Sequence, residues 1–207
     1  MKKTIIKFII DNTKYLTLKM MGPVEEIYLF DDITIVYHDA RKQYVLYTKD
    51  FVCEALRGFE SVLKLAIKNQ FVLHESIQKD IGYLWNEYLE EKEEQHNFVE
   101  KSLEGIIYWV GGKHHLFQSK FKEYDTWLYN KDGEIYLEIT PYYQWHFDEP
   151  QKNENFIPYE EFIKNYKPLV ILKIDKGQAE EWLKIVSNLV IIAEKNFQLW
   201  NKTAAEG

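Results

Sequence analysis

The sequence predicts an α+β fold in which antiparallel sheets are covered by about four helices, one of them a long C-terminal helix. The first 49 residues alternate with the two-residue period of half-buried strands. Short turns separate these strands, which favours antiparallel pairing because parallel strands need long crossovers. From about residue 50 the apolar period becomes that of a helix, and strands return after about residue 100.

The N-terminal part contains five predicted strands, each rich in β-branched or aromatic residues. Turn residues stand between them, for example Gly22-Pro23 and Asp31-Asp32. The predicted strands span residues 5–10, 15–20, 26–30, 33–38 and 44–48.

Two helices are expected next. Asp50 is a candidate N-cap for the first, whose apolar residues recur at three- or four-residue steps up to Ile67. The second begins near Ser76 and has an apolar stripe on one side and an acidic stripe on the other. One side of this helix therefore faces the core, and the other faces water or a partner.

The second half predicts strands again, with the clearest hairpin of the chain at Asp132-Gly133, where the turn needs a positive φ. Pro141 ends a strand and precedes a long polar, aromatic and acidic loop. The strands span 106–110, 126–129, 134–140 and 169–174, the loop spans 142–156, and the helices span 159–166 and 178–201. The last helix has a heptad seam that suits either a core or an oligomer interface, so the oligomeric state stays open.

The composition is that of a folded chain, since 46% hydrophobic and 29% charged residues exclude a disordered or collagen-like protein. No linker rich in glycine, proline or serine divides it, so residues 1–207 are expected to form one α+β domain. The net charge of -7 argues against direct nucleic-acid binding, which depends on clustered lysine and arginine. Six Trp, fifteen Tyr and twelve Phe residues supply rings for a core or for a contact surface.

The excess of acid is local. Residues 76–100 carry seven acidic and two basic side chains, whereas residues 1–75 carry ten and eleven. A second acidic group lies in and after the segment 142–149, which also bears Trp145 and Phe147. Acidic charge steers a basic partner, and aromatic rings anchor it. The alternative is that the acids only solvate the surface and that the rings tuck beneath the loop.

Two segments therefore supply the predicted contact surface for a basic protein partner. The predicted partner-binding residues are Glu87, Glu90, Glu91 and Glu94 of the second helix, and Trp145, His146, Asp148 and Glu149 of the loop.

Signals for a cofactor or a metal are weak. The chain has no GxGxxG sequence, and Gly111-Gly112-Lys113 lacks the first half of a Walker motif. A single cysteine excludes thiolate zinc sites, and the adjacent His114 and His115 point to opposite faces of a strand. No cofactor and no metal are expected.

Signals for catalysis are equally weak. Cys53, at the start of an apolar helix, is interpreted as an inert buried thiol, because no sequence feature places a histidine beside it. A pair of carboxylates such as Asp125 and Glu138 stays open as acid–base machinery, although acidic pairs are too common to indicate an enzyme.

The compartment is expected to be the cytoplasm, because one cysteine cannot form an internal disulfide. The N-terminus begins like a signal peptide, but Lys7 interrupts its apolar stretch and Asp11 closes it. Elsewhere in the chain the longest wholly apolar run, residues 189–193, is far below the roughly 20 residues that span a bilayer, so no membrane segment is expected.

Several segments of the second half have the strand, turn and helix order of a known family. They are Tyr124-Asp125-Thr126-Trp127, Gly133-Glu134-Ile135-Tyr136, Trp145, Tyr159-Glu160-Glu161-Phe162 and Ala179-Glu180-Glu181-Trp182. Over roughly residues 105–185 the chain resembles bacterial immunity proteins of polymorphic or contact-dependent toxin systems. The resemblance implies a non-enzymatic cytosolic protein that binds a cognate toxin domain, in many cases a nuclease with a basic cleft, and blocks its active site. It implies no catalytic residues.

A second class of function stays open. A small-molecule-binding domain or enzyme would use a pocket between sheet and helices, lined by Tyr108, Trp109, Trp127 and Tyr136. This alternative predicts a deep, partly apolar cavity with converging polar groups and shifted pKa values.

Overall fold

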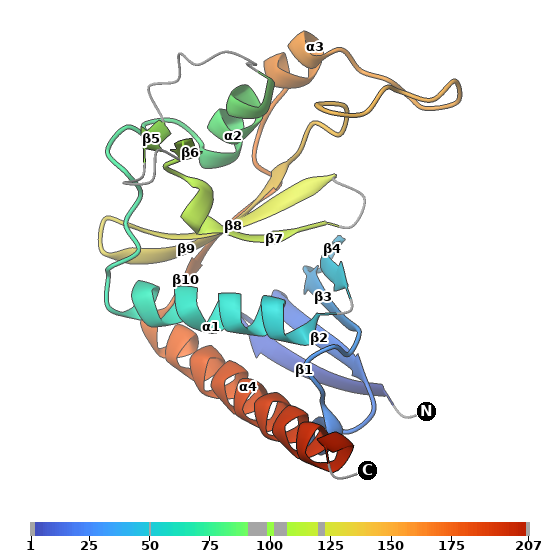
Figure 1. Cartoon of the computed structure of the whole chain (residues 1–207). Helices are drawn as coiled ribbons and strands as arrows, with labels where there is room; N and C mark the ends of the chain where they lie inside the picture. Colours follow the sequence, from blue (N-terminus) through green and yellow to red (C-terminus); the bar gives the residue numbers. More distant parts are fainter. Residues whose placement is uncertain (1–2, 50, 91–98, 102–106, 120–122, 206–207) are drawn as a thin grey trace.

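The computed structural model of the chain, shown in Figure 1, describes residues 3–49, 51–90, 99–101, 107–119 and 123–205. It confirms the predicted α+β class. The described residues form two four-stranded antiparallel sheets and four α-helices, among them a long C-terminal helix. A short two-stranded sheet pairs β5 (Val99–Lys101) with β6 (Ile107–Trp109).

The first sheet consists of β1 (Lys3–Ile9), β2 (Tyr15–Met21), β3 (Ile33–His38) and β4 (Gln43–Lys49). Its strands pair in chain order, and each is antiparallel to its neighbours. Alternate side chains face opposite sides, so Leu16 and Leu18 of β2 are fully buried while Lys7 of β1 is exposed. The period-two pattern therefore describes β1, whereas β2 also buries Thr17 and β3 buries five of its six residues.

The second sheet consists of β7 (His115–Gln118), β8 (Tyr124–Lys131), β9 (Glu134–Pro141) and β10 (Val170–Ile174). Its order is β10-β9-β8-β7, again antiparallel throughout. The predicted hairpin joins β8 to β9, with φ of 52° at Asp132 and 80° at Gly133, the positive values that its turn requires.

The two faces of the second sheet differ in polarity. Leu128 of β8 and Leu137 of β9 point into the main core. The opposite face carries Asp125, Trp127 and Glu138, because side chains alternate along each strand and Trp127 lies opposite Glu138 in the register. Buried polar groups thus gather on the face that α2 covers.

The helices are α1 (Val52–Ile67), α2 (Ile81–Glu90), α3 (Tyr159–Lys164) and α4 (Lys176–Ala205), with short 3-10 turns η1 (Val24–Glu26) and η2 (Gly112–His114). Figure 1 shows α1 and α4 side by side. They run antiparallel, since Arg57 Nη2 lies 2.7 Å from Glu194 Oε1 and Ser187 Oγ donates to Glu60 Oε1 at 2.7 Å.

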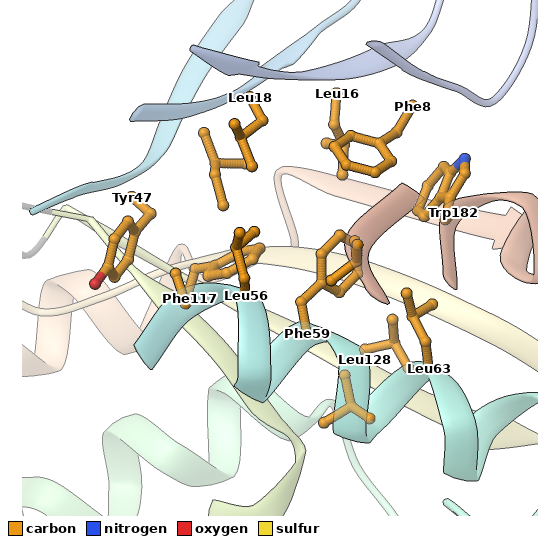
Figure 2. Close-up of a cluster of buried hydrophobic side chains, with 14 of the residues drawn as sticks. Phe8, Leu16, Leu18, Tyr47, Leu56, Phe59, Leu63, Phe117, Leu128 and Trp182 are labelled. Atoms are coloured by element: carbon orange, nitrogen blue, oxygen red, sulfur yellow. The ribbon is translucent and has the colours of Figure 1, made fainter. Parts of the chain in front are cut away.

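One buried cluster contains side chains from both large sheets and from α1 and α4, as Figure 2 shows. Phe59 of α1 is 1% exposed, and its ring centroid lies 5.8 Å from that of Phe8, 5.7 Å from that of Phe117 and 6.1 Å from that of Trp182. All three pairs are edge-to-face, an arrangement that aromatic rings prefer. One α1 side chain therefore contacts the first sheet, the second sheet and α4.

Residues 26–30, expected as a strand, do not form one: Glu26 ends η1, residues 27 and 28 are irregular, and residues 29 and 30 lie in a turn. Ile27 and Leu29 are buried, which preserves the period-two pattern, but none of the described strands pairs with them. The amide of Asn196 on α4 donates to the carbonyl oxygens of Glu25 and Ile27, at 2.9 Å each. A helix side chain thus satisfies the backbone that a neighbouring strand would otherwise satisfy.

The second helix begins at Ile81, later than the expected start near Ser76. Asp80 caps it, because Asp80 Oδ1 accepts a hydrogen bond from the Tyr83 backbone N–H at 3.0 Å. Ser76 lies in a turn, where its hydroxyl is 2.7 Å from His74 Nδ1. The predicted cap of the first helix, Asp50, lies outside the described residues.

Candidate functional site

The acidic helix and the aromatic loop predicted as one contact surface do lie next to each other. We define the arm as residues 142–166, which leave β9 and include α3; Figure 1 shows the arm projecting from the end of the second sheet beside α2. Glu87 and Glu90 of α2 are partly exposed, and Glu87 Oε1 lies 4.0 Å from Lys79 Nζ. The predicted contact residues Glu91 and Glu94 lie outside the described residues.

Asn86 of α2 fixes the start of the arm. Its buried amide nitrogen donates to the carbonyl oxygens of Gly82, at 2.7 Å, and Pro141, at 3.0 Å. Its Oδ1 accepts the Tyr143 backbone N–H at 2.7 Å and lies 3.2 Å from Nε2 of His146. Three of these four contacts, with Pro141, Tyr143 and His146, hold the start of the arm in a defined orientation on the helix.

Gly82 allows α2 to lie close to β9. A Cβ at this position would overlap the side chain of Thr140 and the hydroxyl of Tyr166, so the contact requires glycine. Thr140 also accepts a hydrogen bond from Trp127 Nε1 at 2.8 Å. The helix therefore packs directly on the polar face of the second sheet.

His146, expected on the contact surface, is buried beneath the arm. Burial lowers the pKa of His146, while the hydrogen bond and the charge of Glu90 oppose that effect. Its Nδ1 lies 3.0 Å from Glu90 Oε2 and its Nε2 faces Asn86 Oδ1, so a neutral ring donates one of these bonds and a protonated ring donates both. His146 thus positions the arm and does not offer a free surface.

Trp145 belongs partly to the interior of the arm. Its Nε1 donates to Glu154 Oε2 at 3.2 Å. Its ring packs edge-to-face on Tyr143 and Phe156, with centroid separations of 5.5 and 5.3 Å. The alternative expectation was that the aromatic rings pack beneath the loop. It holds in part for Trp145, which is half-buried.

The outer surface of the arm is apolar and acidic. Phe147, Phe156 and Ile157 are 68, 48 and 42% exposed. The predicted contact residues Asp148 and Glu149 are exposed next to Phe147. Phe156 and Ile157 were not among the predicted contact residues, although two adjacent apolar residues within a polar loop were the signal that could have indicated them.

The Asn86 anchor yields a prediction. We expect Asn86→Ala to lower the free energy of unfolding by about 2 kcal/mol, because it leaves the Tyr143 N–H and the Pro141 carbonyl without their buried partner. Amide hydrogen exchange at Tyr143 should accelerate well before global unfolding. Asn188→Ala, at an exposed position of α4, is the matched control and should change neither quantity. An unchanged exchange rate at Tyr143 would contradict the anchoring role.

The rings expected to line a ligand pocket are packed instead. Trp109 and Trp127 are buried and contact Trp85 of α2, with centroid separations of 5.2 and 6.1 Å. Tyr136 stacks on a neighbouring tyrosine of β8. The side chain of Tyr108 lies outside the described part of the structure. These rings form a second apolar cluster between α2 and the sheet.

The carboxylates of Asp125 and Glu138, considered above as a pair, have separate partners. Asp125 Oδ1 lies 2.9 Å from His115 Nε2. Glu138 Oε2 accepts the Tyr129 hydroxyl at 2.6 Å. The second carboxyl group near Glu138 belongs to Asp80, whose Oδ1 also accepts the Tyr166 hydroxyl at 2.7 Å.

The environment of Glu138 shifts its titration strongly. Burial raises the pKa of Glu138 to about 8, and the charge of Asp80 adds to this effect. Burial also raises the pKa of Tyr129 and of Tyr166, so both hydroxyl groups stay protonated and donate to the carboxyl pair. Glu138 therefore carries a proton at neutral pH.

Other chemistry is sparse in the part of the chain that the structure describes. No three His, Cys, Asp or Glu side chains gather there as a metal-binding group. Cys53 is half-buried and packs against the main core. None of the described helices combines the length and the apolar character needed to cross a membrane.

No family model, no curated protein and no solved structure matches this chain. The resemblance to immunity proteins therefore stays a prediction.

Proposed function

We propose that this chain is a non-enzymatic binding protein, an immunity protein that neutralises a toxin domain in the cytoplasm, and that it binds through the outer surface of the arm. The observation that carries this proposal is the group of large apolar side chains that the arm exposes, Phe147, Phe156 and Ile157. Clustered apolar side chains rimmed by polar ones mark interaction sites on folded proteins.

The charge of the arm supports a basic partner. Residues 142–166 contain five acidic and two basic side chains, and Asp148, Glu149, Glu160 and Glu161 are exposed. A surface of this kind accelerates association with a positively charged domain and disfavours acidic partners. A nuclease toxin, whose cleft must attract phosphate, has the complementary charge.

The anchoring of the arm supports tight binding. Asn86 and His146 hold its first residues against α2, and Tyr143 packs on Tyr159 and Phe162 at centroid separations of 5.3 and 5.2 Å. A surface that is already ordered loses less conformational entropy on binding than a flexible loop. The exposed aromatic side chains are therefore presented in a preorganised form.

The function is tested with the partner captured from native cells, purified and titrated against variants. We expect Phe147→Ala to weaken binding about tenfold or more, as truncation of an aromatic anchor does. Ile191→Ala, on α4 and similarly exposed at 62%, is the matched control and should leave the affinity within about twofold. The captured protein should also stop growth when expressed alone, and co-expression of this chain should restore it.

Charge reversal tests the electrostatic part of the same proposal. Asp148→Lys with Glu149→Lys should slow association and reduce its dependence on salt, since a basic partner is no longer steered to the arm. Glu180→Lys with Glu181→Lys introduces the same charge change at exposed positions of α4 and serves as the control. Equal association rates for the two double variants, or equal affinities for Phe147→Ala and Ile191→Ala, would refute the arm as the contact surface.

A further inference from the structure

A pocket of about 480 Å³ lies between the segment that precedes α2 and the β8–β9 hairpin. It is distinct from the outer surface of the arm, because the exposed residues Phe147, Phe156 and Ile157 do not line it. The arm approaches the pocket at its last residue, Tyr166, whose hydroxyl donates to Asp80 Oδ1. Its volume is within the range of small-molecule sites. Apolar walls come from Val72, Leu73, Ile77, Ile81 and Ile171.

Two carboxyl groups meet at this pocket. Glu138 is 2% exposed, and its Oε1 accepts no hydrogen bond from the described residues, whereas Oε2 accepts the Tyr129 hydroxyl. Asp80 lies within hydrogen-bonding reach of Glu138. Two ionised carboxylates repel each other and neither can donate a hydrogen bond, so this arrangement requires a shared proton or a cation.

The nearby lysines do not supply that cation. Lys79 lines the pocket, but its Nζ lies 4.0 Å from Glu87 Oε1 and 4.8 Å from the centroid of the Tyr83 ring. Lys131 is exposed on the hairpin, and its charge has the smallest effect on the pKa of Glu138. Among the described residues, neither lysine forms an ion pair with Asp80 or Glu138.

We propose that this pocket binds a cationic group, an ammonium or a guanidinium on a short alkyl chain, between the carboxyl groups of Asp80 and Glu138. Such a group donates hydrogen bonds to both carboxylates and replaces the proton that they share. Its alkyl chain lies along the apolar wall that includes Val72 and Ile77. A free small amine and an arginine side chain of another protein share this chemistry, and the experiment separates them.

The test is a calorimetric titration of the full chain with butylguanidinium and with butylurea, which has nearly the same shape but no charge. We expect saturable binding of butylguanidinium only. Its affinity should rise about tenfold per pH unit between about pH 5.5 and 7.5, because binding then releases the proton of Glu138. Tyr129, Lys131, Asp80 and Tyr166 also face Glu138. Burial raises the pKa of the Tyr129 and Tyr166 hydroxyl groups, so neither of them ionises inside that window.

Variants assign the effect to the carboxyl pair. Glu138→Gln should weaken butylguanidinium binding at least tenfold at about pH 8 and abolish the pH dependence, since glutamine carries no titrating charge. Glu134→Gln removes a partly exposed carboxylate of the same strand, paired with Lys173 at 2.8 Å, and should leave the affinity unchanged. A pH dependence that persists in Glu138→Gln would assign it to another lining group, such as His74, and would overturn the proposal.

A third compound, arginine capped at both backbone ends, represents an arginine side chain of another protein. If it binds with the same affinity as butylguanidinium, the natural ligand is a protein side chain. If it binds more weakly, the natural ligand is a free small amine. A cation site would be refuted if butylurea bound as tightly as butylguanidinium, or if neither butylguanidinium nor capped arginine bound saturably. Phe147→Ala should not affect these titrations, so this proposal and the proposed function fail independently.

Discussion

Phe59→Ala should lower the free energy of unfolding by about 4 kcal/mol, the range measured when large buried aromatic side chains are truncated. The Phe59 ring contacts Phe8 of β1, Phe117 of β7 and Trp182 of α4, and the cavity left by its removal is closed on all sides by elements distant in sequence. Because folded domains are stable by only about 5–15 kcal/mol, this loss is a large part of the total.

The measurement is urea unfolding followed by tryptophan fluorescence and by far-UV circular dichroism. We expect both signals to change in one coincident transition, because Phe59 belongs to a cluster shared by both large sheets. Phe30→Ala, which truncates a ring that is 51% exposed, is the control and should cost less than about 1 kcal/mol. Two separate transitions would contradict the expectation of a single domain over residues 1–207.

Glu138→Gln should stabilise the protein at alkaline pH, with a gain on the order of 4 kcal/mol at about pH 8. In the unfolded chain this carboxyl group ionises near its ordinary pKa of 4.5, whereas burial and Asp80 raise the folded pKa to about 8. The folded state therefore binds one more proton throughout this window. Stability contributed by protonated Glu138 is present below pH 4.5 and is lost as the pH rises toward 8.

The measurement is the difference in unfolding free energy between the variant and the natural chain at several pH values. Glutamine keeps the shape and the hydrogen-bonding capacity of the protonated side chain but cannot ionise. The gain should rise with pH up to about pH 8 and should disappear below pH 4.5, where glutamate is protonated in both states. Glu134→Gln should show no such trend. A constant difference across the pH range would indicate that Glu138 is not the buried titrating group.

Local patterns in the sequence predicted much of the fold. The strand of residues 33–38 has the predicted limits, and the Asp132-Gly133 turn has the expected positive φ values. Residues 26–30 show the same alternation without forming a strand. Their backbone carbonyl groups accept hydrogen bonds from an amide side chain of α4, about 170 residues away in the sequence. An alternating sequence indicates which side chains are buried, but it does not indicate which groups form hydrogen bonds with the backbone.

The site was predicted less completely than the fold. Charge and aromatic composition indicated the arm and α2, and the structure places Glu90 of α2 beside His146 of the arm. The sequence could not show that His146 faces inward, because a loop has no periodicity that orients its side chains. The carboxyl pair of Asp80 and Glu138 joins residues 58 positions apart, and only the packing of α2 on the second sheet brings them together.

The way Asn86 holds the arm allows this protein to acquire a different binding partner by substitution of surface residues. Three of the four groups that contact the Asn86 amide are backbone atoms, those of Gly82, Pro141 and Tyr143. Backbone hydrogen bonds are indifferent to the side chains carried by the outer surface of the arm. Substitutions at Phe147, Asp148 or Phe156 can therefore change which partner binds without changing how the arm is held. The binding surface and its support can evolve, or be engineered, separately.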